Sequence, residues 1–207
     1  ILFTTKTGVI KKSNLSSYRN IRKGGIIAIN IEDGDELIAA LMTNGHNEVV
    51  LITKDGMSIR FSEEGIRDMG RTATGVWGIR PAKGDFVIGA ALVVADTTLL
   101  VAGANGVGKR TEFDEYRLQG RGGKGIITMK VTDKTGDVVG ALSVRETDEI
   151  MLITSGGQSV RTRVSEIRMT GRNAQGVRLI GLGEGEKLQA MAPVVSQSME
   201  EEIESVE

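Results

Sequence analysis

Residues 49–60 read VVLITKDGMSIR: an apolar run, a turn with glycine, and a second run that ends in a base. The same pattern recurs at 1–12 (ILFTTKTGVIKK), 99–110 (LLVAGANGVGKR) and 150–161 (IMLITSGGQSVR). The four turn glycines are 48, 50 and 51 residues apart, and they are Gly8, Gly56, Gly106 and Gly157. A unit that recurs at a nearly fixed spacing indicates a repeat protein whose neighbouring units stack to bury a shared core.

The second half of each unit repeats as well. It holds two apolar runs around a Gly-Asp or Gly-Glu turn, and its four copies are GIIAINIEDGDELIAAL, GVWGIRPAKGDFVIGAAL, GIITMKVTDKTGDVVGAL and GVRLIGLGEGEKLQAMA. Short β-branched and aliphatic runs bounded by Asp, Gly and Asn predict strands and hairpins, and no window shows a convincing helical period. We therefore predict four strands per unit, which makes sixteen strands in all.

A four-stranded module of about 50 residues is typical of a propeller blade. The units lack the Gly-His and Trp-Asp signatures of WD40 blades. We predict an all-β, propeller-like fold in which each unit forms its own four-stranded blade of a single domain. The predicted blades cover about 1–48, 49–98, 99–149 and 150–198, and an acidic tail follows at 199–207.

The composition excludes several classes of protein. The chain has no cysteine, which removes disulfides, thiolate zinc sites and thiol nucleophiles. No run approaches the ~20 apolar residues of a membrane span, and no signal segment opens the sequence, so we expect a cytoplasmic protein without a membrane partner. The 28 glycines, close to twice the usual ~7%, indicate many tight turns.

The net charge of −1 hides an asymmetry along the chain. Five of the 27 acidic residues lie within 200–207, so residues 1–198 carry 26 basic against 22 acidic residues and a net charge of +4. A basic body followed by an acidic tail favours a polyanionic partner.

Two glycine motifs imitate nucleotide-binding loops. Residues 101–111, VAGANGVGKRT, come within one residue of a P-loop, but Arg110 stands where the motif needs Ser or Thr after Lys109. The G-x-G-x-x-G at 120–125 is followed by IITMKV, which alternates like a strand, whereas a dinucleotide fold needs a helix there. The positions that match 103–109 in the other units are hairpin turns, and 120–125 lies in the irregular segment that joins two hairpins, so we predict no bound nucleotide or other cofactor.

The sequence offers little for a metal or a catalytic centre. The single histidine, His46, lies in a TNGHNE turn without a partner histidine, as expected of a solvated side chain. The Gly-Asp pairs at 34/35, 84/85 and 136/137 are explained by turn chemistry, because Asp beside Gly is common in tight turns. We predict neither a metal site nor catalysis.

Aligning the units on the turn glycine gives three basic columns, at four, eleven and fifteen residues after the glycine. The first column is Lys12, Arg60, Arg110 and Arg161; the second is Arg19, Arg67, Arg117 and Arg168; the third is Lys23, Arg71, Arg121 and Arg172. Because rotation about one axis relates the units, each column predicts a basic belt that matches a bent phosphate backbone. Some of these bases could instead pair with Glu63, Glu115 or Glu166, and the second column could brace its loop against the packed residue before each arginine.

The predicted partner is double-stranded DNA. The chain has only seven aromatic residues, too few for the stacking platforms that single-strand and RNA readers use. Glycines around the third column would let a duplex approach the main chain closely. We therefore expect contacts to the DNA backbone without reading of the base sequence.

The stretch QGRGGKG resembles the Q-R-R-G-G-K-G box in the C-terminal domain of the DNA gyrase A protein. This box-like loop is Gln119, Gly120, Arg121, Gly122, Gly123, Lys124 and Gly125. The units are similar to the blades of that family as far as the acidic tail. The resemblance implies a β-pinwheel, normally of six blades, that wraps DNA around its rim so that an ATP-dependent type II topoisomerase introduces negative supercoils. It adds Lys124 to the candidate DNA contacts.

The same resemblance implies partners and limits. The partners would be the rest of the gyrase A protein and the gyrase B protein in a heterotetramer, on the nucleoid of a bacterium. The family's box lies in the first blade and has Arg where Gly120 stands, whereas this box-like loop lies in the last unit but one. Judged by its acidic tail, this chain resembles the last four blades of the family. It contains nothing similar to the cleavage domain, so neither Tyr18 nor Tyr116 should be catalytic. The tail at 199–207 would either compete with DNA for the belt or keep the protein soluble.

Two rivals remain. The corresponding domain of topoisomerase IV has a degraded box, and a protein-interaction β-propeller would carry the basic belt only incidentally.

Overall fold

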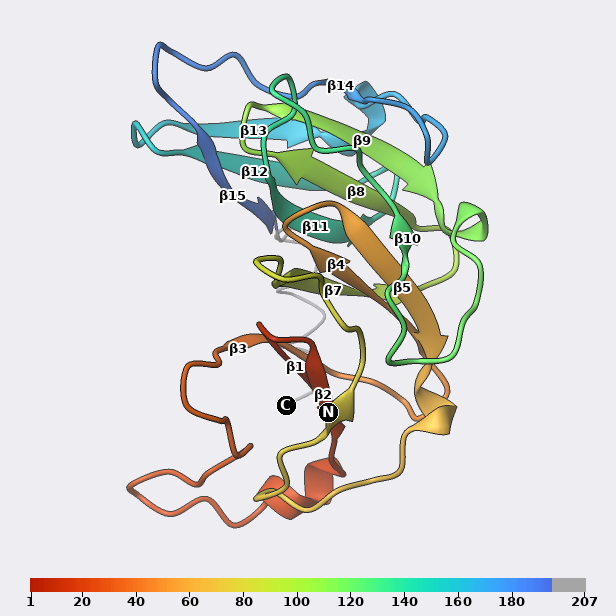
Figure 1. Cartoon of the computed structure of the whole chain (residues 1–207). Coiled ribbons are helices and arrows are strands. Elements are labelled where there is room, and N and C mark those ends of the chain that lie inside the picture. The colour runs from red at the N-terminus through yellow and green to blue at the C-terminus, as the bar shows by residue number, and fades with distance from the viewer. Residues whose placement is uncertain (195–207) are drawn as a thin grey trace.

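The computed structural model describes residues 1–194, and almost all of its regular structure is β (Figure 1). The acidic tail predicted at 199–207 lies outside the described residues. The strands are β1 (Leu2–Thr5), β2 (Val9–Lys12), β3 (Leu37–Leu41), β4 (Glu48–Thr53), β5 (Met57–Ser62), β6 (Val76–Trp77), β7 (Val87–Val93), β8 (Thr98–Gly103), β9 (Val107–Glu112), β10 (Ile126–Ile127), β11 (Val138–Val144), β12 (Glu149–Thr154), β13 (Ser159–Arg163), β14 (Val177–Arg178) and β15 (Leu188–Pro193). The second strand of each unit leads into a 3₁₀ turn, and these turns are η1 (Leu15–Tyr18), η2 (Glu63–Gly65), η3 (Phe113–Glu115) and η4 (Val164–Glu166).

The strands form four antiparallel sheets, which confirms the all-β propeller-like fold. Their strand orders are β3-β1-β2-β6, β10-β5-β4-β7, β11-β8-β9-β14 and β13-β12-β15. Each sheet contains one hairpin, which forms the middle of the three four-stranded sheets, and β3, β7, β11 or β15 lies beside the first strand of the hairpin. These four strands contact one another from blade to blade, so they are the inner strands of the propeller.

The prediction that each unit forms its own blade is wrong in one respect. The outer strands β6, β10 and β14 come from the following unit and pair with β2, β5 and β9 of the unit before. Among the described residues this leaves fifteen strands rather than sixteen. The segment at 26–27, which matches the outer strands in the first unit, is not a strand, and β13 has no outer neighbour in the described chain.

The hydrophobic core lies between neighbouring blades, because successive side chains of a strand point to opposite faces. On β4, Val49 and Leu51 pack toward β1 and β2, whereas Val50 and Ile52 pack toward β8. On β8, Leu100 and Ala102 face the last blade. Burial on both faces explains why these strands read as continuous apolar runs and not as an alternating pattern.

The turn glycines identified in the sequence mark contacts between units. Gly56 closes the turn between β4 and β5 with a φ of +81°, a conformation that glycine adopts most readily. Its carbonyl accepts the N–H groups of Thr128 and Met129 of the next unit, at 2.8 and 3.2 Å. A Cβ on Gly56 would lie 1.9 Å from the carbonyl oxygen of Met129. Gly8 and Gly106 meet a carbonyl of the following unit in the same way, whereas a Cβ on Gly157 would meet no atom within 4 Å, so the close approach of the next unit requires glycine at the first three turns.

Candidate nucleic-acid interface

The first basic column does not face outward, which corrects the expectation for three of its four members. Arg60 on β5 is only 15% exposed, and its Nε lies 2.5 Å from Oε2 of Glu48. Its Nη1 donates to the carbonyls of Phe113 and Tyr116 in the next unit, at 2.7 and 3.1 Å. Arg60 therefore links neighbouring blades and is not a surface cation.

Lys12 has the same role at the preceding junction, whereas Arg110 is buried against a carboxylate of its own unit. Lys12 donates to the carbonyl of Glu63 at 3.1 Å and lies 3.7 Å from Asp68. Arg110 is 6% exposed and pairs with Glu146. In the last unit Arg161 is exposed but pairs with Glu149. We therefore remove Lys12, Arg60 and Arg110 from the candidate belt.

The second column lies at the surface. Arg19, Arg67, Arg117 and Arg168 are all exposed, and within residues 1–194 none of them forms an ion pair. In the last three units the residue before each arginine packs into the core, and these residues are Ile66, Tyr116 and Ile167. In these units the residue after each 3₁₀ turn is buried and the arginine that follows it is exposed. The bracing role considered for the second column is therefore filled by the largely buried members of the first column and by these core residues.

The third column lies on the segments that we call the outer loops, residues 18–25, 66–75, 116–125 and 167–176. In the last three units each loop leads into an outer strand, β6, β10 or β14. The loop enters along the second strand of the previous blade, with hydrogen bonds from Met69 to Lys12, Gln119 to Arg60 and Thr170 to Arg110. The last three outer loops therefore cross the blade junctions at the edge farthest from β3, β7, β11 and β15. In Figure 1 the green loop before β10 follows the right-hand side, while β15 lies on the left.

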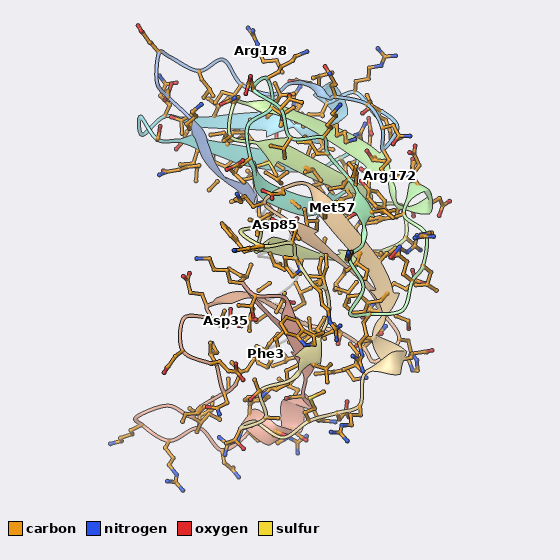
Figure 2. The ribbon with its side chains drawn as sticks, viewed as in Figure 1. Phe3, Asp35, Met57, Asp85, Arg172 and Arg178 are labelled. Atoms are coloured by element: carbon orange, nitrogen blue, oxygen red, sulfur yellow. The ribbon has the colours of Figure 1, made fainter. Side chains whose placement is uncertain are left out.

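Two arginines of the third column repeat one contact. Nη1 of Arg121 donates to the carbonyl of Trp77 on β6 at 3.3 Å, and Nη1 of Arg172 donates to the carbonyl of Ile127 on β10 at 2.6 Å. Each arginine thus reaches across to the outer strand that the preceding unit supplies. A guanidinium has five N–H donors, so most of them stay available to a ligand. Figure 2 shows Arg172 and Asp35 on opposite sides of the molecule.

The box-like loop is the outer loop of the third unit and is not a dinucleotide site. Gly122 donates to the carbonyl of Gly78 at 2.6 Å, and Arg80 donates to that of Gly123 at 2.9 Å. A Cβ on Gly125 would lie 2.2 Å from the carbonyl oxygen of Ser58. Strand β10 follows directly, so the glycines serve close packing against the previous blade, and the exposed Lys124 lies close to Arg121 in the sequence.

The P-loop-like stretch is likewise a hairpin, as predicted. It forms the β8–β9 turn, and Lys109 lies on β9 with its side chain buried. No helix follows to direct N–H groups at a phosphate, because the chain continues into η3.

Sequence reasoning missed three exposed side chains at the outer edge. Trp77 on β6 is 42% exposed, and the guanidinium carbon of Arg80 lies 5.8 Å from the centre of its ring. Ile127 on β10 and Arg178 on β14 occupy the same position in their units and are exposed as well. Arg178 was the signal available in the sequence, because a repeat position that holds an arginine in one unit is expected to be exposed to solvent in the others.

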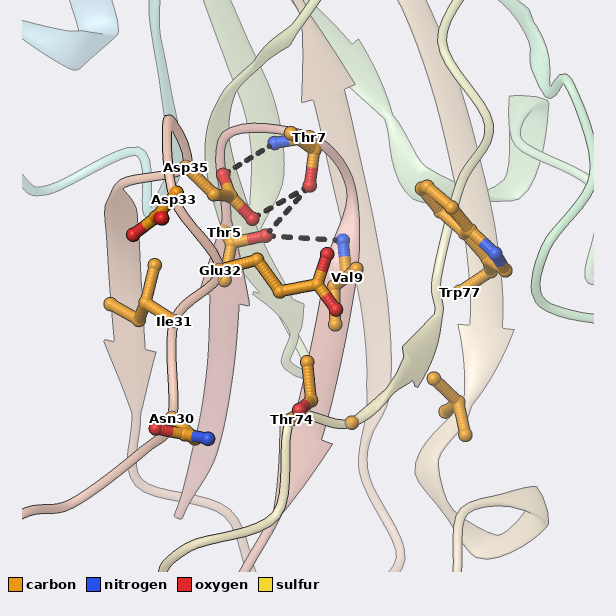
Figure 3. Close-up of a pocket in the computed structure, with 12 residues that line it drawn as sticks. Thr5, Thr7, Val9, Asn30, Ile31, Glu32, Asp33, Asp35, Thr74 and Trp77 are labelled. Carbon is orange, nitrogen blue, oxygen red and sulfur yellow. Dashed lines mark hydrogen bonds between the residues drawn. The ribbon is translucent and has the colours of Figure 1, made fainter.

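The carboxylates of two Gly-Asp turns, Asp35 and Asp85, accept hydrogen bonds within the fold, and Figure 3 shows those of Asp35. Asp35 accepts hydrogen bonds from the main-chain N–H of Thr7 at 2.9 Å and from its hydroxyl at 2.7 Å. Burial opposes ionisation of Asp35, but hydrogen bonds from Thr5, Thr7 and Glu36 outweigh it and lower the pKa of the carboxyl group. Asp85 accepts the N–H of Asp55 at 2.9 Å in the same way. In the described part of the chain no cluster of three or more His, Cys, Asp or Glu could hold a metal ion.

No helix in residues 1–194 has the length and apolarity needed to cross a membrane.

Comparison with known proteins extends the sequence similarity over all four units. The family model described as DNA gyrase C-terminal domain, beta-propeller, matches residues 1–44, 47–93, 97–145 and 148–194. The DNA gyrase A protein of Salmonella typhimurium is 43% identical over 207 residues, which cover 100% of this chain and 24% of that protein. The DNA gyrase A protein of Mycolicibacterium smegmatis is 44% identical over 194 residues, covering 93% of this chain and 23% of that protein. The chain thus spans about a quarter of the length of these curated relatives.

Solved structures share the fold. A structure of the DNA gyrase A C-terminal domain superposes with a TM-score of 0.84 at 27% identity, covering 94% of this chain and 65% of that one. The C-terminal domain of DNA topoisomerase IV superposes with a TM-score of 0.88 at 25% identity, covering 93% of this chain and 61% of that one.

Proposed function

This chain belongs to the family of DNA gyrase C-terminal β-propeller domains, and we propose that it binds double-stranded DNA along its outer edge and bends the duplex around that edge. The repeated outer loops carry the proposal. Each of the four outer loops holds exposed or partly exposed bases of the second and third columns, and the last three of these loops follow one another along the edge where the blades meet. The proposed contacts are Arg19, Lys23, Arg67, Arg71, Arg117, Arg121, Lys124, Arg168 and Arg172, together with Arg161, the exposed member of the first column.

The contacts are to phosphates and not to bases. Arginine and lysine side chains on loops, together with glycine-rich main chain, suit the DNA backbone, which carries no sequence information. Bending 20 to 30 base pairs by 40 to 90° costs about 1 to 6 kcal/mol, and several charge contacts along a curved edge offset a cost of that size.

In the whole protein, this chain would be the non-catalytic, DNA-wrapping part of the gyrase A protein. Its partners would be the rest of that protein and the gyrase B protein in a heterotetramer in the bacterial cytoplasm, where ATP-driven strand passage introduces negative supercoils. The domain would need no cofactor of its own. The names of the curated relatives support this assignment.

The domain of topoisomerase IV is the second candidate, favoured by the similar fold of its C-terminal domain. The two are separated by attaching this chain to a gyrase core that lacks its own C-terminal domain. Negative supercoiling of relaxed plasmid with ATP is expected from a gyrase domain, whereas relaxation or decatenation without supercoiling would favour topoisomerase IV.

A salt titration of duplex binding tests the interface. If about six to eight bases meet phosphates, log K should fall against log salt with a slope of roughly −5 to −7. Replacing Arg71, Arg121 and Arg172 together by alanine should weaken binding to every sequence alike and reduce the slope by about 3. The control replaces Lys83, Lys134 and Lys187 by alanine, which removes the same amount of positive charge. These three lysines are exposed in the turns before the inner strands.

The control should change the slope by less than half as much. A flat salt dependence would instead favour a protein-interaction propeller. Equal effects of the two triple variants would mean that net charge alone, and not the outer edge, attracts DNA.

A further inference from the structure

Two lysines are fully buried at matching places in the second strands of their hairpins. Lys11 on β2 and Lys109 on β9 are both 0% exposed. Neither forms an ion pair with a residue of the described chain, in contrast to their neighbours Lys12 and Arg110. A buried ammonium without a carboxylate is costly unless its hydrogen bonds are satisfied.

The hydrogen bonds of Lys109 all go to one outer loop. Its Nζ donates to the carbonyls of Gly171, Arg172 and Ala174, with distances of 3.4 Å to Gly171 and 3.0 Å to Ala174. An ammonium has three N–H donors, so these three acceptors match its full capacity. A side chain rooted in the third unit thus holds the main chain of the fourth unit.

Lys11 repeats the arrangement two units earlier. Its Nζ donates to the carbonyls of Gly70 and Arg71 at 3.2 and 2.6 Å, and to that of Ala28 at 2.6 Å. In both cases one acceptor is the carbonyl of the residue that carries the third-column guanidinium, Arg71 or Arg172. The anchor therefore acts at the residue that the proposed function places against DNA.

The intervening junction shows that the fold does not require an ammonium at this place. Ile59 occupies the matching position on β5, and Gly123 of the box-like loop lies against it, with a contact of 3.6 Å from the position of a Cβ to Cδ1 of Ile59. That loop is held instead by main-chain hydrogen bonds with Gly78 and Arg80. An apolar residue fills the space, so filling space does not explain the two lysines.

We propose that Lys11 and Lys109 are positioning residues for DNA binding: each buried ammonium fixes the outer loop of the next unit and thereby aims Arg71 or Arg172 along the outer edge. The inference rests on the proposed function and adds residues that never touch DNA. Burial lowers the pKa of Lys109 to about 8, with Glu115 opposing and Arg172 adding to the decrease, as expected of an ammonium held among main-chain carbonyls.

Hydrogen exchange without DNA tests the anchor. In Lys109→Met, amides of residues 170–176 should exchange at least about tenfold faster, because three carbonyls of the loop lose their donor. In Lys11→Met the change should move to residues 69–73. Each variant is thus a control for the other, and Lys134→Met, which replaces an exposed lysine of the third unit, should change neither loop.

A double-mutant cycle on duplex affinity tests the link to DNA. Lys109→Met should weaken binding about tenfold and reduce the salt slope by about 0.9, as if one phosphate contact were lost, although no exposed charge is removed. In an Arg172→Ala background, the same substitution should cost less than about twofold, since Lys109 acts through Arg172.

The outcomes separate the two proposals. Unchanged loop exchange in both lysine variants would overturn the anchor. Faster exchange with unchanged affinity, or equal costs in the two backgrounds, would overturn its role in positioning while leaving DNA binding intact. If the wild-type chain fails to bind duplex DNA, the proposed function falls, and the exchange data alone decide whether the lysines hold the loops.

Discussion

Arg60 and Arg67 show how differently two bases seven residues apart can be used. Arg60 is held by Glu48 and by carbonyls of the next unit, whereas Arg67 is exposed. In the sequence both are single arginines in conspicuous columns. The difference is that Arg60 lies on a strand that the next unit covers, whereas Arg67 lies on an outer loop. The sequence does not show which strands a neighbouring unit covers, so it could not distinguish the two arginines.

Lys109 makes stability depend on pH in an unusual direction. Its pKa is about 8 in the folded protein and about 10.4 in an unfolded chain. Between these values the unfolded state binds a proton that the folded state does not, so the Lys109 contribution becomes more favourable as pH rises and less favourable as pH falls toward 8.

We expect the stability of the wild type relative to Lys109→Met to increase by about 2 kcal/mol from pH 7.5 to 9.5. Urea unfolding of both proteins at the two pH values measures it, and taking the difference cancels groups that titrate alike in both. A constant difference would mean that the lysine is not desolvated in solution.

At the scale of elements, the hairpins were predictable and the outer strands were not. Strands such as β4 and β8 are six residues long, apolar and bounded by turn residues, which is a strong local signal. Strands β6, β10 and β14 have two residues each and pair with another unit. Two residues carry no periodicity, so the exchange between units could not be read from the pattern.

Substitutions at the turn glycines test the contact between neighbouring units. Gly56 and Gly84 have nearly the same φ, +81° and +86°. A Cβ added at Gly56 would collide with Met129, whereas a Cβ added at Gly84 would meet no other atom. Alanine at Gly84 should cost about 1 to 2 kcal/mol for the left-handed conformation alone. Alanine at Gly56 should cost at least about 2 kcal/mol more, because the next unit must move away.

Denaturant unfolding of the two variants gives the comparison. Similar costs would show that the junction adapts and that conformation alone explains the glycine.

At the scale of the whole molecule, the basic edge follows from repetition. The second and third columns were predicted from spacing, and their side chains lie on the outer loops. Because rotation about one axis relates the units, residues that align in the sequence lie in a row in space. This prediction needs no knowledge of side-chain contacts. The prediction was wrong for three members of the first column, because their side chains are largely buried on the second strands of the hairpins and not exposed on the outer loops.

Sharing of strands predicts how the molecule responds to truncation. A chain that ends after Val144 loses β14, so β9 becomes an edge strand, while β5 keeps its partner β10. Hydrogen exchange should show β9 amides losing protection, with β5 close to its level in the longer chain. Full protection of β9 would mean that the blades are independent, as the sequence units alone had suggested.

The same exchange of outer strands affects synthesis on the ribosome. The hairpin and inner strand of the second blade are complete once Val93 has emerged, but its outer strand is not available until Ile127 follows. At about 5 to 20 residues per second, this leaves a nascent blade with an open edge for some seconds. Translation of the chain therefore runs ahead of its folding by most of a unit, and a pause inside an outer loop would prolong the interval in which unpaired strands can find a wrong partner.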